Sequence, residues 1–292
     1  MLTKSYIKIQ VANALNEDLG IFGDITSQAI IEPDQISVAT IVLKQDAVLC
    51  GIDFAISAFK QLDKKTKVLS HKTDGKYLKK GAVVLKLKAK TQSILAAERS
   101  ALNFLGLMSG IATKANLFSK IAKPYGVKIF STRKTIVGIR DLQKYALTVG
   151  GANINRMTLD DFFFIKDNHI ANTSSIVESI ARVRAFYPKK KITVEVDNIK
   201  QLKQTINEKI DVALLDNMNA KQIRECLKFV GGRFKCEASG NINLNNLKSI
   251  AQTKVDRIST GQLTHSIKNI DFGLELYSIK SLIICKSIND KI

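Results

Sequence analysis

The sequence of 292 residues predicts an α/β fold with a parallel α/β barrel in its second half. Short apolar runs alternate there with helix-length segments, which is the pattern of βαβ units in a parallel sheet. Pairs of glycine and hydroxyl residues follow the last of these runs. A doubly wound sheet often carries its phosphate glycines in the first βα turn, so their late position favours a barrel.

The first third of the chain predicts a helix followed by a small antiparallel sheet. Residues 2–16 place Ile7, Val11 and Leu15 at helical spacing. Three β-rich runs then alternate with polar turns, at 37–43, 47–50 and 83–87. A long helical region is expected over 94–122, which Ser109 and Gly110 could interrupt.

The second half contains the strands and helices expected of the barrel. The apolar runs that predict strands lie at 127–130, 162–165, 192–194, 212–215, 233–236 and 257–258. The segments that predict helices between them include 174–186, 199–206 and 220–229. Because the carboxyl ends of parallel strands share one rim, residues that follow these runs are expected to lie close together.

The composition excludes several classes of protein. No apolar run approaches the roughly 20 residues of a membrane span, and the N-terminus lacks an apolar signal core, so a cytoplasmic location is expected. The four cysteines are dispersed without a CxxC pair, which favours buried free thiols over zinc or disulfides. The formal net charge of +19 raises the alternative of nucleic-acid binding. Runs such as Lys189-Lys190-Lys191 are typical of a solvated surface instead, and specific nucleic-acid binding is not expected.

Charged or hydroxyl residues follow every predicted strand, and they sort by position along the chain. The early strands supply the cations Arg133, Lys134, Arg140, Arg156 and Lys166. Several such cations around one ligand indicate an acceptor with more than one carboxylate. The middle strands supply two carboxylates, which could hold Mg²⁺, bind sugar hydroxyls or stabilise a developing cation. These are Glu195 and Asp216.

The last two predicted strands are followed by small residues that could seat a phosphate on backbone N–H groups. They are Ser239-Gly240 and Ser259-Thr260-Gly261. Each group has a simpler interpretation alone. An arginine could form a surface ion pair, Glu195 or Asp216 could cap the next helix, and Ser239-Gly240 could be an ordinary turn. Their order along the chain favours a site for an anionic, phosphorylated substrate.

The same residues lie in motifs that resemble the quinolinate phosphoribosyltransferase family. They include Thr132-Arg133-Lys134-Thr135, Lys166-Asp167-Asn168-His169 and Glu237-Ala238-Ser239-Gly240. Further matching segments lie at 17–26, 98–103, 109–113, 138–140, 144–146, 194–196, 215–218 and 259–265. The resemblance covers almost the whole chain. It implies an incomplete parallel α/β barrel over 113–270 and an N-terminal α+β sandwich-like domain formed by 1–112 with 271–292.

The resemblance also implies an activity. Quinolinate and phosphoribosyl diphosphate would give nicotinate mononucleotide, diphosphate and CO₂ with Mg²⁺, as a step of NAD biosynthesis. Thr132, Arg133, Lys134, Arg156 and Lys166 would line the quinolinate pocket, with Lys134 among the catalytic groups. Glu195 and Asp216 would act in catalysis by holding the ribose hydroxyls and, directly or indirectly, the metal. The 5′-phosphate would lie on Ser239, Gly240 and Gly261. Arg99 would enter the site of a neighbouring subunit in a homodimer or a higher even oligomer.

One loop departs from the family pattern. Residues 150–159 carry Ala152, Ile154, Asn155 and Thr158 where the pattern has Gly, Asn, the active-site His and Gly, and Val137 stands where it has Pro. Asn155 is still expected among the substrate-binding groups, since it can donate a hydrogen bond, but it cannot become a cation. The sequence therefore leaves open a related phosphoribosyltransferase with a different anionic acceptor.

Overall fold

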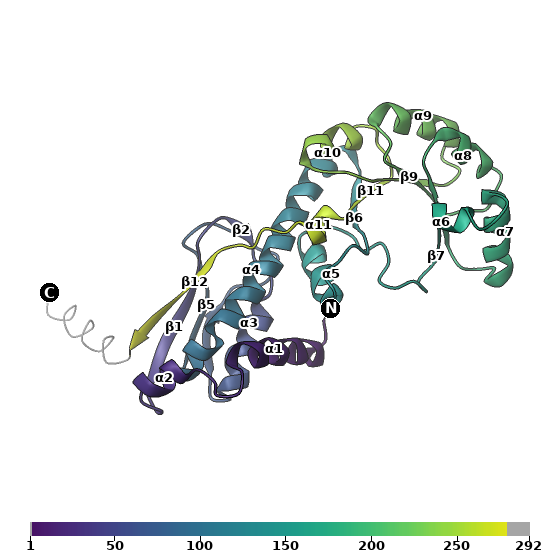
Figure 1. Ribbon diagram of the computed structural model, residues 1–292. Coiled ribbons are helices and arrows are strands. Elements are labelled where there is room, and N and C mark those ends of the chain that lie inside the picture. The colour runs from purple at the N-terminus through teal and green to yellow at the C-terminus, as the bar shows by residue number, and fades with distance from the viewer. Residues whose placement is uncertain (1, 279–292) are drawn as a thin grey trace. The chain divides into compact units, whose positions relative to one another are not determined.

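The computed structural model describes residues 2–278, which form two compact units (Figure 1). The first contains residues 2–113, 141–150 and 267–278, and the second contains 114–140 and 151–266. The domain boundaries expected from the sequence remain a prediction. They differ from these units chiefly at 141–150, which packs within the first unit, and the expected tail at 279–292 lies outside the described residues.

The first unit is built on an antiparallel sheet of order β12-β1-β5-β3. These strands are β1 (Ile36–Leu43), β3 (Lys67–His71), β5 (Val83–Lys90) and β12 (Phe272–Ser278), and a separate pair is formed by β2 (Ala47–Val48) and β4 (Tyr77–Leu78). The helices are α1 (Lys4–Leu19), α2 (Ile25–Ile30), α3 (Ile52–Leu62) and α5 (Arg140–Val149). The expected N-terminal helix and antiparallel sheet are confirmed. β12 pairs with β1 from Ser37↔Ser278 to Leu43↔Phe272, so the start of the predicted C-terminal addition joins this sheet.

The long helix α4 (Thr91–Ala122) runs through Ser109 and Gly110 without the interruption that the sequence allowed. Ser109 Oγ accepts a hydrogen bond from Cys50 N at 2.9 Å and lies 3.1 Å from Cys50 O, so its hydroxyl is used away from the helix backbone. A Cβ at Gly106 would lie 2.9 Å from the carbonyl oxygen of Ile270, and Gly110 is crowded in the same way by Lys268. These glycines therefore mark a close approach between backbones rather than a break in the helix.

The second unit contains six parallel strands in the order β6-β11-β10-β9-β8-β7. They are β6 (Lys128–Ser131), β7 (Phe163–Ile165), β8 (Ile192–Val196), β9 (Val212–Asp216), β10 (Lys235–Ser239) and β11 (Arg257–Thr260). No ladder joins β6 to β7 among the described residues, so the sheet has the order of an incomplete barrel. All six strands lie where the sequence predicts apolar runs. β10 and β11 extend further than those runs, because Glu237, Ala238, Ser259 and Thr260 are buried strand residues.

Helices α7, α8 and α9 lie on one side of these strands (Figure 1). The helices of this unit are α6 (Asp167–Ile170), α7 (Ile176–Phe186), α8 (Ile199–Gln204), α9 (Ala220–Val230), α10 (Leu244–Ala251) and α11 (Gln262–His265), with a 3₁₀ turn η1 (Lys123–Tyr125). Their apolar faces are buried, as at Ile223, Cys226 and Val230 of α9. Val194, Ala213 and Leu215 are fully buried, so helices and strands share one core.

Two further expectations concern the cysteines and membrane-spanning helices. Cys50, Cys226 and Cys236 are buried free thiols, as predicted, and Cys285 lies outside the described part of the chain. Between residues 2 and 278, no helix is both long enough and apolar enough to cross a membrane.

Candidate active site

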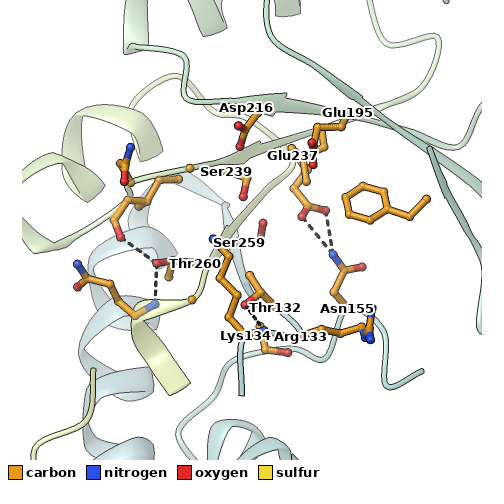
Figure 2. Close-up of a pocket in the computed structure, with 18 of the residues that line it drawn as sticks. Thr132, Arg133, Lys134, Asn155, Glu195, Asp216, Glu237, Ser239, Ser259 and Thr260 are labelled. Atoms are coloured by element: carbon orange, nitrogen blue, oxygen red, sulfur yellow. Dashed lines mark hydrogen bonds between the residues drawn. The ribbon is translucent and has the colours of Figure 1, made fainter. Parts of the chain in front are cut away.

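A pocket of about 510 Å³ lies at the carboxyl ends of the parallel strands (Figure 2). The structure brings almost all the predicted site residues to its wall, namely Thr132, Arg133, Lys134, Asn155, Arg156, Lys166, Glu195, Asp216, Ser239, Gly240 and Gly261. The first and last of them, Thr132 and Gly261, are more than 100 residues apart in the sequence. Arg99 is different, because it lies exposed on α4 in the first unit.

The carboxylates Glu195 and Asp216 lie at the ends of the adjacent strands β8 and β9. Glu195 is largely buried and its Oε2 lies 2.8 Å from Nζ of Lys166, which directly follows β7. Burial and the charge of Asp197 raise the pKa of Asp216, against the opposing effects of Lys166 and Lys134. Neither carboxylate caps a helix, since Asn198 caps α8 and Asn219 caps α9. Both carboxylates therefore belong to the pocket.

Two of the cations lie next to an aromatic ring that the sequence did not single out. Phe164 of β7 has the guanidinium of Arg156 4.9 Å from its ring centroid and the ammonium of Lys166 4.8 Å from it. Burial and the charge of Arg133 lower the pKa of Arg156, against the opposing effect of Asp161. Nε of Arg133 is buried and makes no hydrogen bond to the described residues. These cations thus hold a concentrated positive charge that suits an acceptor with several anionic groups.

Arg140 was expected among these cations, but it does not line the pocket. Its Nε donates to Thr135 Oγ1 at 3.2 Å and its Nη1 donates to the carbonyl of Met157 at 2.9 Å. Arg140 therefore holds together the two loops that carry Arg133 and Arg156.

The turns after β10 and β11 line the pocket, and each contains a glycine that is crowded by neighbouring residues. Gly240 has φ +82°, and a Cβ there would lie 2.7 Å from the backbone N of Asn217. At Gly261 a Cβ would lie 2.8 Å from Cδ2 of His265 and 3.0 Å from Cδ of Lys134. Both glycines therefore allow neighbouring residues to pack closely against these turns. Small residues that expose backbone N–H groups form the usual seat of a phosphate.

Glu237 is the main pocket residue whose place the sequence analysis missed. The apolar run at 233–236 predicts Glu237 as the residue after a strand, but Glu237 lies inside β10 and is fully buried. Its carboxylate accepts a hydrogen bond from Asn155 Nδ2 at 3.1 Å, and Nε of Arg257 lies 2.7 Å away. That contact is an ion pair and not an aligned hydrogen bond, since Nε of Arg257 makes no hydrogen bond within residues 2–278. Burial raises the pKa of Glu237, while Arg257 and the Ser259 hydroxyl act against this.

Other pocket residues carried a weaker signal in the sequence. Asn241, Gln262 and His265 also line the pocket. The last two lie in a motif noted for the family resemblance, but only their neighbour Gly261 was assigned a role. In the sequence, Asn241 is marked only by its position next to the predicted turn at Ser239-Gly240. That position does not distinguish a residue that lines a pocket from one that is exposed to solvent.

Two family models match the chain over most of its length. The model of the quinolinate phosphoribosyl transferase N-terminal domain matches residues 24–109, and the model of the C-terminal domain matches residues 111–275. The chain belongs to the quinolinate phosphoribosyltransferase family. In this family member, the C-terminal match includes every residue of the pocket.

Curated relatives of this quinolinate phosphoribosyltransferase family member are similar over nearly the full chain. A probable nicotinate-nucleotide pyrophosphorylase (carboxylating) of Methanocaldococcus jannaschii is 37% identical over 94% of this chain and 99% of its own length. A protein of Bacillus subtilis with the same description is 37% identical over 92% of this chain and 94% of its own length.

Solved structures of similar proteins have the same fold. The nicotinate-nucleotide pyrophosphorylase of Francisella tularensis superposes with a TM-score of 0.90 at 36% identity, covering 95% of this chain and 98% of that one. NadC of Streptococcus pyogenes gives a TM-score of 0.92 at 32% identity, covering 96% and 99%. The fold expected from the sequence, with an antiparallel N-terminal α+β part and a parallel C-terminal sheet, is confirmed.

Proposed function

We propose that this protein transfers a phosphoribosyl group from phosphoribosyl diphosphate to quinolinate, with decarboxylation, and so makes nicotinate mononucleotide for NAD biosynthesis. The pyridine nitrogen forms a bond to C1′ while the C1′–O bond breaks and diphosphate leaves with the electron pair. The bond from C2 to its carboxylate then breaks. Its electrons stay on C2, where the adjacent pyridinium stabilises them, and a proton replaces the departing CO₂. One observation carries the proposal: four Lys and Arg side chains, three carboxylates and two glycine turns meet in one pocket.

The cationic part of the pocket is the proposed quinolinate site. Arg133, Arg156 and Lys166 would meet the two carboxylates, with Thr132 and Asn155 as hydrogen-bonding neighbours. The Nε of Arg133 is buried and has no hydrogen-bond partner among the described residues, which supports this assignment because a ligand oxygen would satisfy that donor. A planar ring held at both carboxylates has its nitrogen oriented for attack, and such orientation is a large part of joining two bound substrates.

The acidic part of the pocket is the proposed site of the ribose. Figure 2 shows Asp216 and Glu195 on one side of the pocket with Thr132, Arg133 and Lys134 opposite them. The carboxylates would bind ribose hydroxyls and favour positive charge at C1′ as diphosphate leaves. Lys134 packs against Gly261 and lowers the pKa of Asp216, and there its ammonium can stabilise charge on the leaving diphosphate. The 5′-phosphate would bind at Ser239, Gly240 and Gly261.

The carboxylates also fit Mg²⁺. Mg²⁺ prefers oxygen ligands and usually takes one or two protein carboxylates together with substrate phosphates. The described residues hold no cluster of three or more His, Cys, Asp or Glu that would form a metal cage. Glu195 and Asp216, directly or through water, would therefore share the ion with the diphosphate, whose charge it would neutralise.

The direct test is turnover by the purified protein with quinolinate, phosphoribosyl diphosphate and Mg²⁺. We expect equimolar nicotinate mononucleotide and diphosphate, and labelled CO₂ from quinolinate labelled at its 2-carboxylate. Nicotinate in place of quinolinate should give no product.

Lys166→Ala should lower kcat/KM for quinolinate about 10- to 100-fold, since it removes a hydrogen bond to a charged group. Lys191→Ala is the matched control and should have no effect, because Lys191 is exposed at the opposite end of β8. Wild-type protein that forms no nicotinate mononucleotide would exclude the proposed reaction.

A different acceptor is the second candidate, and Asn155 favours it. The family pattern has a histidine there, and Asn155 donates its amide to Glu237. Comparing quinolinate with other pyridine and pyrimidine carboxylates in the same assay distinguishes the two candidate functions, which differ in the acceptor. A higher kcat/KM for another acid would replace quinolinate as the substrate.

A further inference from the structure

Asn217 lies directly after β9 and does not line the pocket, yet it contacts two parts of the site. Its amide Nδ2 donates to Asp216 Oδ2 at 2.6 Å. Its amide Oδ1 accepts a hydrogen bond from Asn241 Nδ2 at 2.9 Å. One side chain thus links the end of β9 to the turn after β10, and both ends of the amide are used.

These two partners fix which way the amide faces. An amide has a donor end and an acceptor end, and a carboxylate can only accept. Asp216 therefore requires Nδ2 on its side, and Oδ1 must face Asn241. A carboxylate or a hydrophobic side chain at position 217 could not make both contacts.

The backbone at this place is also specialised. Asn217 has φ +53°, and Gly240 and Asn241 have φ +82° and +50°. Asn217 N donates to the carbonyl of Ser239 at 3.0 Å, and its side-chain amide packs against Gly240, where no Cβ fits. Asparagine tolerates left-handed backbone better than most residues, so position 217 can hold both this conformation and the amide.

We infer that Asn217 is a positioning residue, which sets the distance between the Asp216 carboxylate and the turn of residues 239–241 and so the fit of a phosphorylated sugar. It acts through Asp216 and this turn and needs no contact with the substrate itself. The identity of that sugar as phosphoribosyl diphosphate rests on the proposed function. The acceptor half of the pocket, with Arg133, Arg156 and Lys166, makes no hydrogen bond to Asn217 among the described residues.

The inference predicts a selective loss of affinity for one substrate. Asn217→Gly keeps the left-handed backbone available and removes the amide alone. Asn217→Asp keeps the shape but replaces the donor by an oxygen that faces Asp216. Both variants should raise the KM for phosphoribosyl diphosphate about tenfold, in the range expected when hydrogen bonds to a charged group are lost. The KM for quinolinate should stay within about twofold of wild type.

Asn219→Asp is the matched control. It makes the same amide-to-acid change two residues away, where Asn219 caps α9 through Lys221 N and Gln222 N. Aspartate caps helices as well as asparagine does, so both KM values should remain those of wild type. Thermal unfolding of each variant verifies that it is folded.

Calorimetric titration with phosphoribosyl diphosphate and Mg²⁺ separates this inference from the proposed reaction. Weaker binding by Asn217→Gly than by wild type supports the positioning role even if no turnover is found. Equal binding and an unchanged KM in a folded Asn217→Gly protein would overturn it. An equal rise in both KM values would also overturn it, since that result indicates general loosening of the site.

Discussion

At the scale of single residues, Asp216 shows how neighbours set the chemistry of the site. Its carboxylate is partly buried at the end of β9, and both burial and the charge of Asp197 raise its pKa. Lys166, Lys134 and the hydrogen bond from Asn217 favour its charged form. The proposed reaction needs the charged form, because a protonated acid stabilises neither a metal ion nor positive charge at C1′.

This balance predicts the acid limb of the pH–rate profile. Activity should fall, as pH decreases, at a higher pH than the ordinary pKa of an aspartate would give. Asp197→Asn removes a charge that raises the pKa of Asp216, so it should move the acid limb to lower pH. The measurement is kcat/KM for phosphoribosyl diphosphate against pH in both proteins. An acid limb that stays in place in the variant would show that another group controls it.

Asn155 and Glu237 are the residues at which local sequence was least informative. The charge of Glu237 is compensated by Arg257 from β11, opposite it in the sheet register. Asn155 adds a neutral donor where the family pattern has a histidine. The carboxylate therefore has a cationic partner that does not depend on position 155, which is a physical reason why a neutral residue is tolerated there.

At the scale of elements, the glycine turns after β10 and β11 have different physical requirements. Gly240 needs both its left-handed backbone and its missing side chain. Gly261 has φ −75°, which any residue can adopt, so space alone requires glycine there. The crowding comes from His265, one turn later in α11, and from Lys134, which follows β6.

Gly261→Ala is therefore expected to leave the fold intact and to displace His265 and Lys134. Because both side chains face the proposed phosphate site, the KM for phosphoribosyl diphosphate should rise about tenfold, the effect of losing one or two polar contacts. Steady-state kinetics measure this, and a thermal unfolding midpoint close to that of wild type separates it from a folding defect. Wild-type kinetics would show that the turn has room that the structure does not indicate.

At the scale of the whole molecule, we propose that Arg99 acts in the site of a second subunit. Arg99 is exposed on α4 in the first unit and is not among the residues that line the pocket in the second. The resemblance implies that it enters the site of a neighbouring chain. A closed dimer would then contain two sites, each made from both subunits.

Mixing two inactive variants tests this arrangement. Arg99→Ala and Lys166→Ala proteins should each have low activity alone. After subunit exchange, a mixed dimer contains one site with both defects and one intact site, so about a quarter of wild-type activity should return, as the symmetry of a shared-site dimer requires. No recovery, with exchange verified by mass spectrometry of differently tagged subunits, would place Arg99 in its own subunit's site or outside any site.

Much of the fold follows from the sequence by itself. Hydrophobic periodicity located all six parallel strands, since a strand buried on both faces appears as a short apolar run. The order of polar groups after those runs also located most of the pocket, because parallel strands end at one rim. The continuity of α4 could not be predicted, because whether Ser109 and Gly110 break a helix depends on what packs against them.

Tertiary structure decided the contacts between strands. Arg257 pairs with Glu237, Lys166 pairs with Glu195, and the ring of Phe164 lies within 5 Å of two cations. Each of these contacts joins residues that the sheet register or a strand end places together. Local sequence determines which face a residue occupies, since that depends on spacing along one strand. It does not determine which residue stands opposite, because that depends on how separate strands align in the folded sheet.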